Sequence, residues 1–288
     1  LGCVTFRETL LLVDPDNVPQ PELQRVADVI HHELAHMWFG DLVTMRWWNG
    51  IWLNEAFATF MEMKCTDAFR PEWGRWIDFG LSRSAAMDID SLVSTRPIEI
   101  AVHSPADAEG MFDLLTYEKG AAVVRMLEQY VGEDAFRDGI RAYLHAHAYA
   151  STETHDLWDA IEASTGEPVR SMMDTWIFQG GHPVVSVEDG ALVQSRFTYL
   201  PTDARDWVVP VRLRDVHAHE HRVLLGGEPA PLPVPASELA SPPPSCADAP
   251  LEPPLDESLL EHAHAAATHV APRSKNPKRF IRTSSLHG

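Results

Sequence analysis

One segment of this chain, Val29 to Phe60, constrains the fold more than any other. It reads VIHHELAHMWFGDLVTMRWWNGIWLNEAFATF and places three histidines and two glutamates in an otherwise largely apolar and aromatic run. Titratable side chains are costly to bury unless they are paired or bound to a metal ion. The fold must therefore bring these side chains together, and it must do so inside an apolar environment.

The helical period sorts these histidines. Successive residues of an α-helix turn by about 100°. His32 and His36 are then offset by about 40° and can converge on one point, whereas His31 and His36 are offset by about 140° and cannot. We therefore predict that His32 and His36 are a pair of metal ligands and that His31 is a neighbour. Glu33 is expected to lie beside the metal rather than on it.

The pattern His-Glu-x-x-His is a zinc-peptidase motif in which the glutamate acts as general base. Two histidines leave a catalytic zinc one protein ligand short, and a glutamate is a known third ligand. Glu55 follows His36 after 18 intervening residues, near the start of a second predicted helix. Glu62 is the alternative, seven positions on and on the same face. We prefer Glu55 as the ligand and Glu62 as an acceptor that orients a ligand histidine.

The chain resembles the aminopeptidase N family of gluzincin metallopeptidases. The resemblance is carried by HELAH and, 18 residues later, WLNEAFA, together with GCVTFRETLLLVDP, MWFGDLVTMRWWNGIWLNE, MFDLLTYEKGAAVVRML and TWIFQGGHPVVSV. It covers about residues 1–228. It implies an α+β fold in which a thermolysin-like, mainly helical zinc-peptidase catalytic domain is followed by a partial β-sandwich domain and a disordered tail.

The predicted domains are a truncated catalytic domain over residues 1–182, without its N-terminal part, and a partial β-sandwich over 183–235. Residues 236–288 are Pro-rich and then basic. This composition is expected of a natural disordered tail or, alternatively, of a frame-shifted reading of a longer gene. A strand is predicted over residues 3–13. Helices are predicted over residues 21–39, 53–68, 72–88, 112–131, 133–147, 153–164 and 168–179.

The resemblance also implies the chemistry. It implies one Zn²⁺ per chain, Glu33 as the base that activates water, and Tyr117 as the residue that stabilises the oxyanion. The implied substrates are peptides with a free N-terminus. Family members recognise the α-amino group through a Gly-Ala-Met-Glu-Asn motif, which would precede Leu1 and is not in this sequence. A thermolysin-type zinc endopeptidase, or an inactive fragment that still binds zinc, is the alternative.

Composition excludes other classes of function. The formal net charge is -19, so binding to a nucleic-acid backbone is not expected. The three cysteines are far apart, which argues against a disulfide framework or a cysteine-built zinc site. A reducing, cytoplasmic location fits this cysteine usage best. No apolar run is long enough to predict a membrane-spanning segment. The sequence does not predict the oligomeric state.

Overall fold

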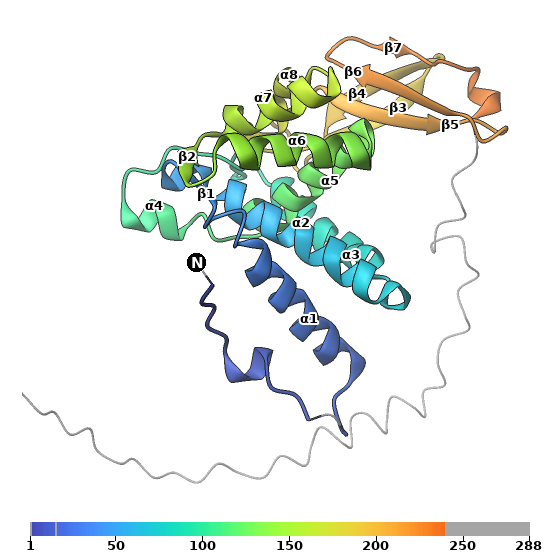
Figure 1. Cartoon of the computed structure of the whole chain (residues 1–288). Helices are drawn as coiled ribbons and strands as arrows, with labels where there is room; N and C mark the ends of the chain where they lie inside the picture. The colour runs from blue at the N-terminus through green and yellow to red at the C-terminus, as the bar shows by residue number, and fades with distance from the viewer. Residues whose placement is uncertain (1, 15, 240–288) are drawn as a thin grey trace, which may run out of the picture. The chain divides into compact units, whose positions relative to one another are not determined.

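The computed structural model describes residues 2–14 and 16–239 of the chain. A helical part that contains helices α1 to α8 and one small sheet, β1–β2, comes first in the sequence. Short strands, β3 to β7, follow it (Figure 1). Together these elements make an α+β fold, as the sequence predicts.

Helix α1, Gln20–Ala35, carries the His-Glu-x-x-His motif up to Ala35, and the second histidine, His36, is the C-cap residue, which keeps helical backbone angles. Pro21 lies in its first turn, where the missing N–H costs nothing. The helix ends four residues earlier than the predicted residue 39. After the last residue of the helix, some hydrogen bonds span three residues instead of four, as in a 3-10 turn. The amide of Met37, for example, donates to the carbonyl of Leu34. Gly40, with φ at +138°, then turns the chain away.

The predicted strand over residues 3–13 is wrong. This segment contains only a 3-10 turn, Glu8–Leu10, and the side chains of Leu11 and Leu12 are 44% and 65% exposed. A strand needs a neighbour to satisfy its backbone N–H and C=O groups. No strand among residues 2–14 and 16–239 pairs with this segment. Its β-branched and aromatic composition is therefore not enough to make it a strand.

Helix α2, Trp52–Phe69, matches the predicted helix over residues 53–68 and packs against α1 and α5 (Gly120–Val131). Most of its circumference is apolar and buried, which is typical of a central helix. Between α1 and α2 lies a three-residue strand, β1 (Val43–Met45), which pairs in parallel with β2 (Ala150–Thr152). These strands were not predicted, because three residues are too few to show a periodic pattern.

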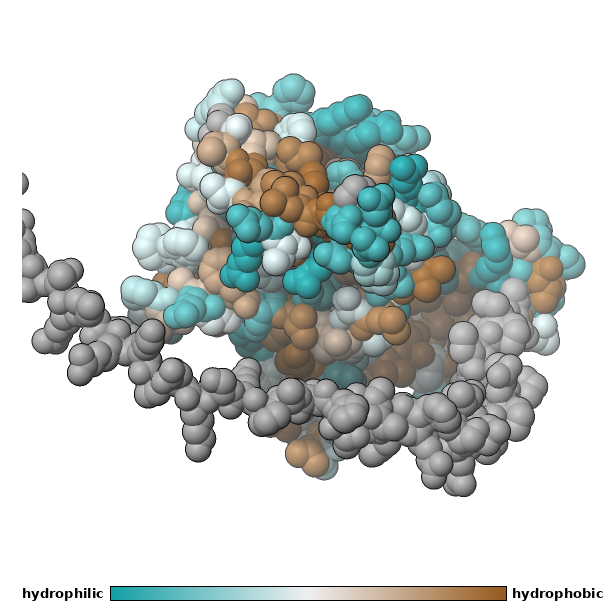
Figure 2. All heavy atoms as spheres, turned by 90° about the horizontal axis from the view of Figure 1, so that it is seen from below, coloured by the Kyte–Doolittle hydropathy of each residue, from teal (hydrophilic) through white to brown (hydrophobic). Residues whose placement is uncertain are grey.

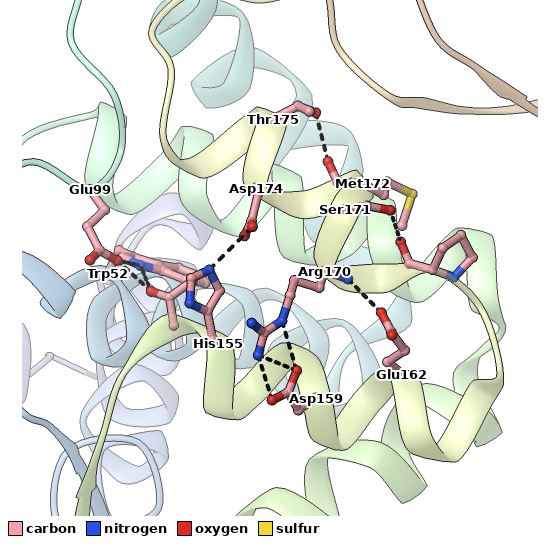
Figure 3. Close-up of polar contacts among 12 residues, drawn as sticks. Trp52, Glu99, His155, Asp159, Glu162, Arg170, Ser171, Met172, Asp174 and Thr175 are labelled. Carbon is pink, nitrogen blue, oxygen red and sulfur yellow. Dashed lines mark hydrogen bonds and ion pairs between the residues drawn. The ribbon is translucent and has the colours of Figure 1, made fainter.

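The start of α2 is tied to a distant part of the chain by Glu99 (Figure 3). The indole Nε1 of Trp52 donates to Glu99 Oε2 at 3.0 Å and to Thr154 Oγ1 at 3.1 Å. The Nδ2 group of Asn49 donates to Glu99 Oε1 at 2.6 Å. The first turn of α2, which carries Glu55, is thus held against the start of α7 (Thr154–Thr165).

The other predicted helices differ from the observed bounds by no more than three residues, if the five-residue π-helix that leads into α5 is counted with it. One short helix, α4 (Pro105–Glu109), was not predicted. The observed elements are α3 (Arg75–Asp90), the π-helix (Leu115–Lys119), α5 (Gly120–Val131), α6 (Glu133–Ala146), α7 (Thr154–Thr165) and α8 (Val169–Ile177).

The run of strands β3 to β7 begins at Pro183. Strands β3 and β4 form an antiparallel hairpin whose Asp189-Gly190 turn has positive φ at both residues, the signature of a type I′ turn. Strand β7 adds to the edge of β4, and β5 pairs with β6 in a separate two-stranded sheet. Their bounds are β3 (Pro183–Glu188), β4 (Ala191–Arg196), β5 (Val209–Arg214), β6 (Glu220–Leu225) and β7 (Ala230–Pro231).

The predicted tail lies mostly outside the described residues. Of it, only residues 236–239 are described, and they form a 3-10 turn, Ala236–Glu238, followed by a bridge from Leu239 to Asp215. No helix in the described part of the chain is long and apolar enough to cross a membrane. Figure 2 shows apolar patches between hydrophilic side chains on one face.

Candidate metal centre

Three side chains from α1 and α2 meet at one point. His32 Nε2 lies 3.3 Å and His36 Nε2 lies 3.4 Å from Glu55 Oε2, and the two ring nitrogens are 3.2 Å apart. A tetrahedral zinc with bonds of about 2.0 to 2.1 Å has its ligand atoms about 3.3 Å from one another. Among the described residues, this is the one group of three or more His, Cys, Asp or Glu side chains that could hold a metal ion. The donor set and its spacing therefore fit zinc.

Each histidine ring is oriented through its second nitrogen. His32 Nδ1 is 3.0 Å from Glu62 Oε2, and His36 Nδ1 is 3.0 Å from the carbonyl oxygen of Phe39. A ring that donates from Nδ1 leaves Nε2 as a lone-pair donor, which is the state that a metal requires. Glu62 thus contacts the nitrogen of His32 that faces away from Glu55. The Phe39 carbonyl was not predicted, because a backbone acceptor leaves no side-chain signal in the sequence.

The carboxylates make the site favourable for a positive charge. Burial lowers the pKa of His32, but the Glu55 and Glu62 carboxylates outweigh it and raise this pKa to about 9. Burial likewise lowers the pKa of His36, yet Glu55 raises it overall. Burial raises the pKa of Glu55, whereas the two imidazoles bring it down to about 2. The same negative potential would stabilise a divalent cation, which must compete with protons for the rings.

Tyr117 lies beside this group. It belongs to the π-helix Leu115–Lys119, and its ring stacks on that of His32, with centroids 6.1 Å apart and an angle of 14°. Burial raises its pKa, and the charges of Glu55 and Glu33 raise it further. The hydroxyl therefore keeps its proton and remains a hydrogen-bond donor. Glu33, half-buried on α1, is close enough for its charge to contribute to the raised pKa of Tyr117.

His31 points elsewhere. Its Nδ1 is 2.8 Å from Thr66 Oγ1, and its ring meets that of Phe69 edge to face. With Leu34 and Ile140 it lines an apolar groove of about 520 Å³ between α1, α2 and α6. His31 therefore lies outside the metal-binding group, as its angular offset from His36 on the helix predicts.

Comparison with known proteins defines the class. Residues 1–176 match the model of the peptidase family M1 domain, so the chain belongs to peptidase family M1. This confirms the resemblance to the aminopeptidase N family.

Individual relatives are similar over most of this chain. It is 45% identical over 217 residues to aminopeptidase M1 of Arabidopsis thaliana, covering 74% of this chain and 25% of the relative. It is 44% identical over 218 residues to tricorn protease-interacting factor F2 of Thermoplasma volcanium, covering 74% of this chain and 28% of the relative. It is 45% identical over 191 residues to the mitochondrial aminopeptidase 2 of Saccharomyces cerevisiae, and the match covers 66% of this chain and 20% of the relative. The chain thus spans about a quarter of the length of these relatives.

Proposed function

We propose that this chain carries the catalytic centre of a zinc-dependent aminopeptidase, which hydrolyses the N-terminal bond of peptides. The observation that carries the proposal is the convergence of His32, His36 and Glu55 at zinc-ligand spacing in a member of peptidase family M1. Relatives named as aminopeptidases support it. Because the match to this chain covers only about a quarter of the length of those relatives, the activity is proposed for the whole protein.

The residues of the chain then have distinct roles. His32, His36 and Glu55 hold one zinc ion, which when bound polarises the scissile carbonyl and lowers the pKa of a water. Glu33 accepts the proton of that water and passes it to the leaving amine. Tyr117 donates a hydrogen bond to the carbonyl oxygen as negative charge develops on it. No serine or cysteine nucleophile is needed.

We also propose the domain organisation and setting that the sequence predicts. Residues 1–182 belong to the catalytic domain and 183–235 to part of a β-sandwich, whereas the predicted tail over 236–288 lies mostly outside the described residues. The hairpins of β3–β4 and β5–β6 support the second of these. Peptides with a free N-terminus are the proposed partners. The cytoplasmic location stays a prediction, and one relative is named as mitochondrial.

The proposal is tested with the full-length protein, using peptides that have a free or an N-acetylated terminus. We expect cleavage of the free peptides and little cleavage of the acetylated ones, because an exopeptidase requires the charged amine. Efficient cleavage of acetylated peptides would instead favour the thermolysin-type endopeptidase. Hydrolysis of neither peptide by a zinc-loaded protein would favour the inactive zinc-binding fragment.

Replacing Tyr117 by Phe is expected to lower kcat by about 10²- to 10³-fold, which is the usual cost of losing one oxyanion donor. KM should change little, because the hydrogen bond strengthens only as the oxyanion forms. Steady-state kinetics on a free-terminus peptide measure both values. Tyr149→Phe, at a side chain that is 80% exposed, is the matched control and should keep full activity.

Replacing Glu62 by Ala is expected to weaken zinc binding by about 10- to 100-fold, because the acceptor that orients His32 is lost. A titration against a competing chelator at fixed pH measures the affinity. Glu133→Ala removes an exposed carboxylate that pairs with Lys64 and serves as the control. An unchanged zinc affinity in Glu62→Ala would show that this carboxylate does not support the site.

A further inference from the structure

Lys119, two residues after Tyr117, forms a completely buried ion pair with Asp90. Lys119 Nζ is 2.8 Å from Asp90 Oδ2, and both side chains are 0% exposed. Lys119 also donates to the carbonyl oxygen of Gly181 at 3.1 Å. Removing two charges from water is costly, and apolar side chains of similar volume are often at least as stabilising. Stability alone therefore does not account for this pair.

The partners of Asp90 fix its carboxylate in place. Asp90 is the last residue of α3, and its Oδ1 accepts from the N–H of Gly181 at 2.8 Å and from Thr95 Oγ1 at 2.7 Å. Gly181 lies two residues before β3. Lys119 is thereby held between the end of α3 and the start of the strands.

The chain just before Tyr117 is held by a second cation, Arg96, which lies in the loop that follows Asp90. Arg96 donates to Asp113 Oδ1 at 2.6 Å and to Thr116 Oγ1 at 3.1 Å. Asp113 Oδ1 in turn accepts from the N–H of Thr116. Residues 90–96 therefore bind the chain immediately before Tyr117 and, through Lys119, two residues after it.

The segment between these anchors is a π-helix that is pressed against α2. The N–H of Lys119 donates to the carbonyl of Leu114, five residues back. A Cβ atom added to Gly120 would come within 2.6 Å of the Cβ of Ala56, which follows the proposed ligand Glu55. Single π turns are rare and frequently occur at functional sites. Here the π turn lies directly over the helix that carries Glu55.

We propose that Lys119 and Asp90 are positioning residues that hold the π turn in register and so keep the Tyr117 hydroxyl at the metal centre. They act through Tyr117 rather than on the substrate. The inference rests on the proposed role of Tyr117 in the aminopeptidase reaction. A displacement of about 1 Å in a catalytic group can cost about 100-fold in rate, so small movements of this turn would be measurable.

The test replaces both charges together, because removing one would leave the other buried and unpaired. In the full-length, zinc-loaded protein, Asp90→Asn combined with Lys119→Met should lower kcat by about 10- to 100-fold while KM stays within about threefold. In a Tyr117→Phe background, the same two substitutions should change kcat by less than about twofold. Lys64→Met with Glu128→Gln, which removes an ion pair between α2 and α5, is the matched control and should leave kcat unchanged.

A crystal structure of the Asp90→Asn/Lys119→Met variant gives a readout that does not depend on activity. Displacement of Tyr117 supports the proposal, and an unmoved Tyr117 overturns it even if the proposed function is correct. Equal kcat losses in both backgrounds also overturn it, because the pair would then affect turnover independently of Tyr117. If the paired variant does not fold, Thr95→Val, which removes one bond to Asp90, replaces it. A kcat loss that disappears with Tyr117→Phe is the supporting result, and no loss, or one that persists, overturns the proposal.

Discussion

Replacing Glu33 by Gln is expected to lower kcat by about 10²- to 10⁴-fold, the usual contribution of a general base. Gln has nearly the same shape but cannot accept the proton of the attacking water. Zinc should remain bound, because Glu33 follows the ligand His32 on α1 and is not one of the three converging side chains. Steady-state kinetics and metal analysis of the same preparation measure the two properties separately.

Glu22→Gln is the control for this prediction, since it makes the same change at an exposed position of the same helix. It should leave kcat and zinc content unchanged. Normal turnover of Glu33→Gln with a full complement of zinc would remove Glu33 as the base. Loss of zinc from Glu33→Gln would instead place this carboxylate on the metal and contradict its assignment beside it.

The part of the site that lies on α1 could be predicted because it depends on one helical period. His32 and His36 are four residues apart, and any regular helix brings their rings to the same side. Glu55 is harder, because it requires the second helix to return against the first. The 18 intervening residues allow this, and the structure shows how they do it, through the turn at Gly40 and the short strand β1.

What could not be predicted depends on partners that are distant in sequence or belong to the backbone. The Phe39 carbonyl that orients His36 has no side-chain signature. The ion pair of Asp90 and Lys119 joins residues 29 positions apart, and nothing in the pattern around either residue indicates burial. Tyr117 is singled out only by the family resemblance. The strand predicted over residues 3–13 failed for the same reason, because pairing depends on a partner and not on composition.

Replacing Glu55 by Gln is expected to weaken zinc binding by at least about 100-fold, beyond the 10- to 100-fold typical of an outer partner such as Glu62. The amide has no charge to balance the metal. In the wild-type protein, free zinc at about 100 times its dissociation constant should raise the free energy of unfolding by about 2.7 kcal/mol. Glu55→Gln should lose this stabilisation at the same zinc concentration, and hydrolysis should become undetectable. Thermal unfolding with and without zinc measures the difference.

Glu153→Gln, at a side chain that is 59% exposed, is the control and should keep the full zinc response. The comparison with Glu62→Ala then decides between the two glutamates. If Glu62→Ala abolished zinc binding and Glu55→Gln did not, Glu62 would be the third ligand. The geometry argues against that outcome, because Glu62 contacts His32 through Nδ1, whereas Glu55 lies against Nε2 of both rings. Only a ligand on the Nε2 side can share one metal ion with His32 and His36, so the larger loss should follow Glu55.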